Sequence, residues 1–308
     1  MSKTSLRQRR INRIGWLFML PALVFGVVFL VVPIVMCFGF SFTDFYMLRP
    51  EAMKFTFSNY AGIFTDELFG KAILNTLFFV VITVPVQCAL ALGLALLVNK
   101  TYKGYGVFKL AYFAPVITSM TVVALLFEIL YKEDGGVFNL ILNALGIASQ
   151  GFLNDPSQAM LCIIFMSVWQ GAGYQMIIIL AGLQGVSKEL YEAAELDGAS
   201  AWKKFVHVTL PGIAPISSFV LVITLVGAFK MFTQVQILTP DGGVDYSTIT
   251  IVYYIFQKGM SEKLVGYGSA ISMLFTLVFV LASIGKNYFM KGVGKYRKYR
   301  AEVVGEGC

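Results

Sequence analysis

Hydrophobic residues gather into six long blocks along the chain, and polar residues collect in the segments between them. A helix needs about 20 mostly apolar residues to cross a bilayer, and each block reaches that length. We therefore predict six membrane-spanning helices, at residues 14–40, 72–98, 107–130, 158–186, 212–238 and 264–288. Several blocks contain proline, which spanning helices tolerate where their neighbours cover the freed carbonyl groups.

The composition excludes a large soluble domain. Of the 308 residues, 57% are hydrophobic and 13% are charged, whereas soluble domains have about 25% charged residues. The sequence therefore indicates an all-α, polytopic membrane protein. The formal charge of +7 comes from basic residues at the edges of the blocks. This pattern is typical of membrane topology and lipid headgroups, and it argues against a nucleic-acid partner.

The positions of lysine and arginine predict the orientation. Most of the 24 Lys and Arg residues lie before the first block or after the second, fourth and sixth. Positive charge stays in the cytoplasm, so we predict that both termini are cytoplasmic. The chain then has a basic tail at 1–13, a six-helix domain at 14–290 and a second tail at 291–308. The first block is too long for a signal peptide, so we expect it to remain as a helix.

The longest segment on the predicted cytoplasmic side covers residues 187–211. Its pattern predicts two short helices separated at Asp197 and Gly198, because glycine tolerates the conformations that end a helix. In the second helix, Trp202 and Phe205 belong to an amphipathic face that we expect to anchor on the helical bundle. Small alanine side chains would let a partner come close. The alternative is an ordinary amphipathic helix lying on lipid headgroups.

The stretch "EAAELDGASAWKKFVHVTLP" resembles the EAA motif of permease subunits of binding-protein-dependent ABC importers. The match covers Glu192, Ala193, Ala194, Asp197, Gly198, Ala199, Phe205, Leu210 and Pro211. The resemblance implies that this segment docks in a cleft of a separate ATPase subunit. It implies that Glu192, rather than Glu189 or Glu195, faces a basic residue there, and that Gly198 sets the angle between the two helices.

A second stretch, "ILTPDGGVDYSTITIVYYIFQKG", is similar to the "LT-x-GGP-x-x-x-T" stretch of carbohydrate permeases, with Val244 in place of the usual proline. "EDGGVFNLILNALG" resembles an outer loop of the same group, and the likeness runs from about residue 15 to 288. It implies a second homologous permease, two copies of an ABC ATPase subunit and an extracytoplasmic substrate-binding protein. It also implies a location among the lipids of a bacterial or archaeal cell membrane.

Catalytic chemistry is missing from the sequence. The chain has no phosphate-binding G-x-x-x-x-G-K-[ST] loop, no metal-ligand spacing and no nucleophile paired with a base. We read its single histidine, His207, as a bystander. We therefore expect no catalytic or metal-binding residue and no bound cofactor, with ATP and Mg used by the partner ATPase.

Polar residues inside the blocks are the candidates for a substrate pathway. A sugar needs hydrogen-bond partners for its hydroxyls and aromatic surface for its C–H faces, and buried ionisable groups are functional candidates. The candidates are Gln170, Tyr174, Lys230, Thr233, Gln234, Glu128 and Tyr131. On one continuous helix, Lys230, Thr233 and Gln234 would share a face with Gly227. Alternatively, these groups bond only to neighbouring helices, and Glu128 meets another subunit.

Taken together, the sequence predicts the permease subunit of an ATP-driven ABC importer for a neutral or an anionic carbohydrate. The alternative is a stand-alone secondary transporter or channel, which would work without an ATPase. A membrane receptor or scaffold is disfavoured because the segments between the blocks form no globular domain. The absence of a clear internal repeat weakens a secondary transporter built from two similar halves.

Overall fold

The computed structural model describes residues 3–99 and 105–281 of the chain. Its secondary structure in these ranges is helical, with an isolated β-bridge between Thr43 and Phe55. The predicted all-α class is confirmed. The chain forms two compact units, one of residues 66–254 and the other of residues 1–65 with 255–308.

Three described helices have the length and hydropathy of a single membrane span, and they match the first, second and fourth blocks. The first is built from α1 (Lys3–Gly26), the π-helical η1 (Val27–Val31) and α2 (Val32–Ser41). The others are α4 (Glu67–Val98) and α8 (Ala159–Gln184). The Asp66 carboxylate caps α4 by accepting hydrogen bonds from two backbone N–H groups of its first turn.

The third block is bent, so the helix predicted at 107–130 is divided into two. It forms α5 (Tyr105–Ile117) and α6 (Met120–Leu130), which meet at 99°. Pro115 removes a backbone donor near the end of α5. Ser119 then takes an extended conformation at the start of α6. The chain therefore turns sharply within the predicted span.

The fifth block is also interrupted, and the prediction of one helix at 212–238 is wrong. The helical segment that ends with α11 (Leu210–Gly212) meets α12 (Ala214–Phe229) at 68°. Proline in the first turn of α12 lacks an N–H group and suits a helix start. A second break separates α12 from α13 (Thr233–Leu238).

Part of the sixth block is described, and it is helical over Val265–Leu281. The rest of that predicted span, up to residue 288, and the tail at 291–308 lie outside the described residues. The described residues contain three single spans, or up to five if each bent pair is one span. Six spans and cytoplasmic termini therefore stay predictions.

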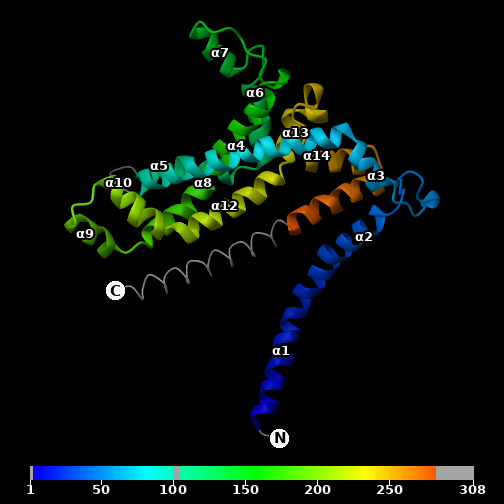
Figure 1. The fold of residues 1–308 in the computed structure, drawn as a ribbon, viewed down its shortest axis with the longest axis horizontal. Coiled ribbons are helices and arrows are strands. Elements are labelled where there is room, and N and C mark those ends of the chain that lie inside the picture. Colours follow the sequence, from blue (N-terminus) through cyan, green and yellow to red (C-terminus); the bar gives the residue numbers. More distant parts are fainter. Residues whose placement is uncertain (1–2, 100–104, 282–308) are drawn as a thin grey trace, which may run out of the picture. The chain divides into compact units, whose positions relative to one another are not determined.

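The core of the 66–254 unit lies where α4, α8 and α12 pack side by side (Figure 1). Small residues such as Ala91, Ala95 and Ala172 are almost fully buried there. Gly173 of α8 lies against α5, and a Cβ at this position would come 2.0 Å from the backbone oxygen of Tyr112. Small residues allow spanning helices to approach this closely. This close packing shapes the site described below.

A short helical subdomain follows α6, containing α7 (Val137–Ala144) and the 3₁₀ turn η3 (Phe152–Asn154). Asn139 is buried and holds it together, donating to the carbonyls of Glu133 and Gln150 at 3.0 and 2.9 Å. Hydrogen bonds from the hydroxyl and backbone of Ser157 hold the pKa of Asp155 below its ordinary value. These hydrogen bonds hold the segment together, alongside ring contacts of Tyr131 with Phe138 and Phe152.

The loop after α13 contains the 3₁₀ turns η5 (Pro240–Gly242) and η6 (Val244–Tyr246) and leads to α14 (Ile251–Phe256). Gly242 and Gly243 have φ values of 88° and 76°, which glycine adopts without steric cost. The Thr248 hydroxyl donates to Thr239 at 2.7 Å, and Asn75 of α4 donates to the carbonyl of Ile249 at 3.0 Å. The loop is therefore fixed to α4.

In the other unit, the segment after α2 folds back on itself through the turn η2 (Pro50–Ala52) and α3 (Ser58–Thr65). The Asn59 amide donates to the carbonyl of Thr43 at 2.7 Å, and Tyr60 donates to the Ser41 hydroxyl at 2.9 Å. The π-helical η7 (Gln257–Ser261) precedes the Val265–Leu281 helix. Gly266 there donates to the carbonyl of Phe45 at 3.0 Å, so the N-terminal and C-terminal parts of this unit are joined.

Candidate functional site

The polar segment at 187–211 has the form that the sequence predicted. It contains α9 (Lys188–Leu196), then α10 (Ala201–Lys204), which continues as the π-helical η4 (Phe205–Thr209) into α11. Gly198 separates the two helices with a φ of 70°. The Ser200 side chain caps α10 by accepting from the Lys203 N–H. The two-helix prediction is confirmed.

Side-chain contacts tie the two halves of this segment together. The hydroxyls of Tyr191 and Thr209 lie 2.9 Å apart, which joins α9 to η4. Lys204 forms an ion pair with Glu195, with 3.5 Å between Nζ and Oε1. Such an exposed pair contributes at most about 1 kcal/mol, but here it also restrains the angle between the helices. The segment is therefore a braced unit connected directly to α12.

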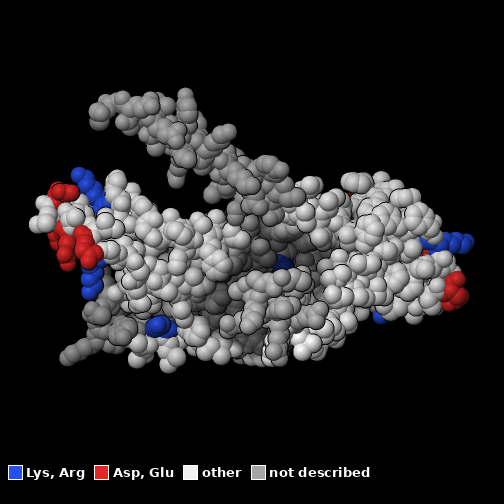
Figure 2. Space-filling model, turned by 90° about the horizontal axis from the view of Figure 1, so that it is seen from below, with Lys and Arg blue, Asp and Glu red and all other residues white. Residues whose placement is uncertain are grey.

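The exposed surface of the segment carries two acids without a side-chain partner among the described residues, Glu192 and Asp197. Glu192 is exposed and has no ion pair or hydrogen bond among the described residues. The other two glutamates of α9 do have partners, since Glu195 pairs with Lys204 and Glu189 accepts a hydrogen bond from Ser187. Figure 2 shows acidic and basic side chains gathered at the end of the unit that carries α9 and α10.

Large apolar side chains accompany these acids. Leu196 is 90% exposed and Trp202 is 70% exposed. The expected anchoring of Trp202 on the helical bundle is therefore wrong, because its ring packs on Phe205, with 5.5 Å between the centroids, and otherwise faces outward. Exposed leucine and tryptophan beside an unpaired acid are typical of a protein-binding surface.

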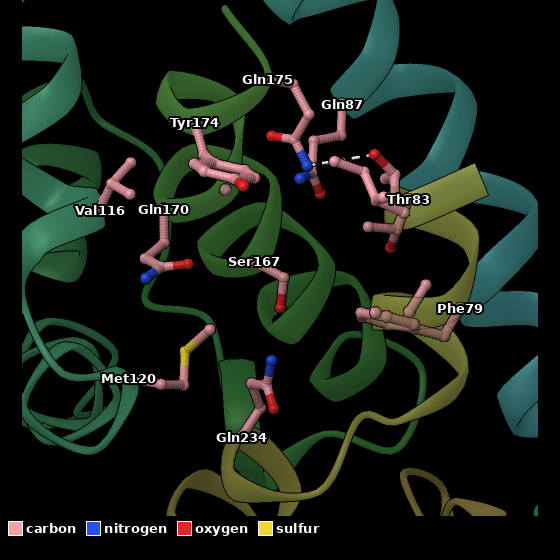
Figure 3. Close-up of a pocket in the computed structure, with 15 residues that line it drawn as sticks. Phe79, Thr83, Gln87, Val116, Met120, Ser167, Gln170, Tyr174, Gln175 and Gln234 are labelled. Carbon is pink, nitrogen blue, oxygen red and sulfur yellow. Dashed lines mark hydrogen bonds between the residues drawn. The ribbon is translucent and has the colours of Figure 1, made fainter. Parts of the chain in front are cut away.

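A cavity of about 300 Å³ lies between the helices of the same unit. Its polar lining comes from Thr83 and Gln87 of α4, from Ser167, Gln170, Tyr174 and Gln175 of α8, from Thr224 of α12 and from Gln234 of α13. Figure 3 shows Ser167 in the middle, with Gln234 on one side and Gln175 and Thr83 on the other. The described lining contains no Asp, Glu, Lys, Arg or His.

Three buried polar atoms in this lining have no hydrogen-bond partner among the described residues. They are Oγ1 of Thr83, Oγ of Ser167 and Oε1 of Gln175. A buried polar group without a partner costs about 1–3 kcal/mol, and such groups are rare in folded proteins. These atoms are therefore available to water or to a ligand in the cavity.

The amide orientation of Gln175 follows from its neighbours. The Thr224 hydroxyl donates its proton to the carbonyl of Val220 at 2.7 Å. It must therefore accept from Gln175, whose Nε2 lies 3.1 Å away. The Gln175 amide oxygen is then the atom left without a partner, and it can only accept a hydrogen bond.

The structure brings together some of the predicted pathway residues and not others. Gln170, Tyr174 and Gln234 line the cavity. The others are not in its lining: Lys230, Thr233, Glu128 and Tyr131. The Tyr131 hydroxyl instead donates to the carbonyl of Cys162 at 3.0 Å. The shared face predicted for Lys230 and Thr233 is wrong, because the helix breaks between Phe229 and Thr233.

Sequence reasoning missed several polar residues of the cavity. Thr83 and Gln87 recur at i and i+4 in an apolar block, and Ser167 precedes Gln170 by three residues. That spacing places each pair on one helix face. Polar pairs at this spacing in the second and fourth blocks could therefore have been predicted as cavity residues.

Comparison with known proteins decides the family. The family described as binding-protein-dependent transport system inner membrane component matches residues 58–295, most of the chain. The chain belongs to this family. It is an ABC transporter permease, as the EAA resemblance implied, and a multi-pass membrane protein.

Curated relatives of this permease include sugar transport proteins. It is 34% identical over 282 residues to the probable ABC transporter permease protein YurN of Bacillus subtilis, covering 90% of this chain and 96% of that protein. It is 34% identical to the arabinooligosaccharides permease AraP of Bacillus subtilis, covering 87% and 86%. It is 32% identical to the lactose permease LacF of Rhizobium radiobacter, covering 93% and 97%.

A solved structure shares the permease fold. A bacterial ABC transporter involved in the import of the acidic polysaccharide alginate matches with a TM-score of 0.82 and 24% identity, covering 93% of this chain and 98% of the other. A second structure of the alginate transporter, in complex with a periplasmic protein bound to alginate pentasaccharide, matches with a TM-score of 0.81. At these identities the likeness concerns the fold alone.

Proposed function

We propose that this permease imports a carbohydrate that an extracytoplasmic binding protein delivers, and that ATP hydrolysis by separate ATPase subunits drives the import. The observation that carries the proposal is the braced segment at 187–211, with its unpaired Glu192 beside exposed Leu196 and Trp202. The names of AraP and LacF, which specify arabinooligosaccharides and lactose, support a carbohydrate.

The complete importer would contain a second homologous permease, two copies of an ABC ATPase subunit and the binding protein. ATP and Mg would be bound by the ATPase subunits, and this chain would bind no cofactor. The assembly would lie in the plasma or inner membrane of a bacterium or archaeon, consistent with the sources of its relatives.

Coupling would proceed through the segment at 187–211. Glu192 would meet a basic residue of the ATPase, while Ala193, Ala194, Asp197, Gly198 and Ala199 form the surface that fits its cleft. The Tyr191–Thr209 contact joins α9 to the π-helical turn, which continues through α11 into α12. Because Thr224 and Gly227 of α12 line the cavity, a displacement of the docked segment would move one wall of the cavity.

The cavity would be the substrate pathway. Gln170 and Gln234 offer donors and acceptors for sugar hydroxyls, and the ring of Tyr174 offers a surface for C–H groups. Closure of the ATPase subunits would open the cavity to the outside, where it receives substrate from the binding protein. Their separation would open the cavity to the cytoplasm and release the substrate there. Lys230, Thr233, Glu128 and Tyr131 would act outside this cavity, along its approach or against another subunit.

Reconstitution in proteoliposomes separates this proposal from a stand-alone transporter or channel. The complete importer should accumulate radiolabelled arabinotriose, lactose or maltotriose only with its loaded binding protein outside and ATP inside. The chain alone should carry none of these sugars down a gradient. Gradient-driven flux through the chain alone, without ATP, would establish the alternative instead.

A further inference from the structure

We infer that the cavity recognises an uncharged, hydroxyl-rich ligand and rejects carboxylated or sulfonated sugars. This inference rests on the proposed function, because it takes the cavity as the substrate pathway and specifies the charge of the substrate. The fold leaves that charge open, since the solved transporter of the same fold is involved in the import of an acidic polysaccharide.

The charge of the lining is the first argument. The described lining of this cavity contains no ionisable side chain apart from the phenol of Tyr174. Lys230 lies between two lining residues, Gly227 and Gln234, along the sequence, yet it is not in the lining. An anion that enters a low-dielectric site needs a cation to replace its water. The cavity offers none.

The three unpartnered atoms are the second argument. The Thr83 and Ser167 hydroxyls can each donate and accept, whereas the Gln175 oxygen can only accept because its Nε2 is committed to Thr224. A ligand that satisfies all three must present a hydrogen-bond donor to Gln175. A sugar hydroxyl does so, whereas a carboxylate or sulfonate oxygen would face an acceptor.

The cavity also has a size and an apolar wall that suit a sugar. Its volume of about 300 Å³ is at the lower end of small-molecule sites, which fits a short stretch of an oligosaccharide. Phe79 and Tyr174 add aromatic surface to the lining. One feature favours an anion, namely the N-terminus of α6, where Met120 reaches the cavity. The partial charge at a helix N-terminus is roughly half of one positive charge, and no charged side chain in the described lining adds to it.

The test uses the complete importer in nanodiscs and matched pairs of probes. Maltotriose is compared with its C6-oxidised glucuronate form, and galactotriose with trigalacturonate. We expect a neutral probe to bind and its anionic counterpart to bind at least about tenfold more weakly. Ser167→Ala and Thr83→Val should each weaken the neutral probe about threefold to tenfold. Gln234→Arg should reverse the preference by adding a cation.

Several outcomes overturn the inference. The inference is wrong if the anionic probe binds as tightly as its neutral counterpart, or more tightly. It is also wrong if both Ser167→Ala and Thr83→Val leave binding of the neutral probe unchanged. Failure of every neutral probe to bind would also overturn it. ATP-driven uptake by the same preparation in proteoliposomes distinguishes failure of the cavity inference from failure of the importer proposal. If uptake persists while these results fail, the cavity inference falls and the importer proposal stands, and if uptake itself is absent, the importer proposal falls.

Discussion

The hydroxyl of Tyr191 lies 2.9 Å from Oγ1 of Thr209. One residue belongs to the first helix of the 187–211 segment, and the other to the π-helical turn that leads into α12. The contact therefore links the exposed surface around Glu192 to the helix that forms one wall of the cavity.

Tyr191→Phe removes this hydrogen bond while keeping the ring. Such a bond contributes about 0.5–1.5 kcal/mol, so we expect the segment to loosen without unfolding. Uptake per ATP hydrolysed should fall in proteoliposomes, while assembly with the ATPase subunits is retained. Tyr246→Phe is the matched control, because that hydroxyl has no hydrogen bond among the described residues. Equal coupling ratios in the two variants would contradict the proposed link.

Gly198→Ala tests the turn between the two short helices. A Cβ there meets no atom within 4 Å, but the φ of 70° is unfavourable for alanine. We expect a cost of about 1–2 kcal/mol, a changed angle between α9 and α10, and lower ATP-driven uptake. Gly70→Ala also has open space around its Cβ, without a positive φ, and should leave uptake unchanged. Equal uptake by both variants would show that the conformation of Gly198 is unimportant.

Gly173→Ala tests the packing of α8 on α5. The Cβ of the introduced alanine would lie 2.0 Å from the backbone oxygen of Tyr112. A backbone atom cannot move aside as the end of a flexible side chain can. We expect a loss of about 1–3 kcal/mol, typical of overpacking, seen as a lower melting temperature of the purified complex. Gly93→Ala, with no atom within 4 Å of its Cβ, should melt like the unmodified protein.

The sequence predicts the 187–211 segment well because its signals are local. Gly198 provides the conformation that ends a helix, and Pro211 lies where α11 leads into α12. The cavity is harder to predict, because it depends on which helix faces meet. No proline or glycine marks the break at 230–232, so the sequence predicts one continuous face for Lys230 and Thr233, whereas the helix is interrupted between them. Gln170 and Tyr174 are predictable because they lie at i and i+4 in an apolar block and so share one helix face.

The most direct test of the central claim is ATP-driven sugar uptake by the complete importer with Glu192→Lys. Like charges that meet across an interface cost several kcal/mol, so uptake should fall at least about tenfold, while the chain still inserts into the membrane. Glu189→Lys makes the same change in the same helix, at an acid that contacts Ser187, and should retain most of the uptake. Unchanged uptake and ATPase stimulation with Glu192→Lys would contradict the account.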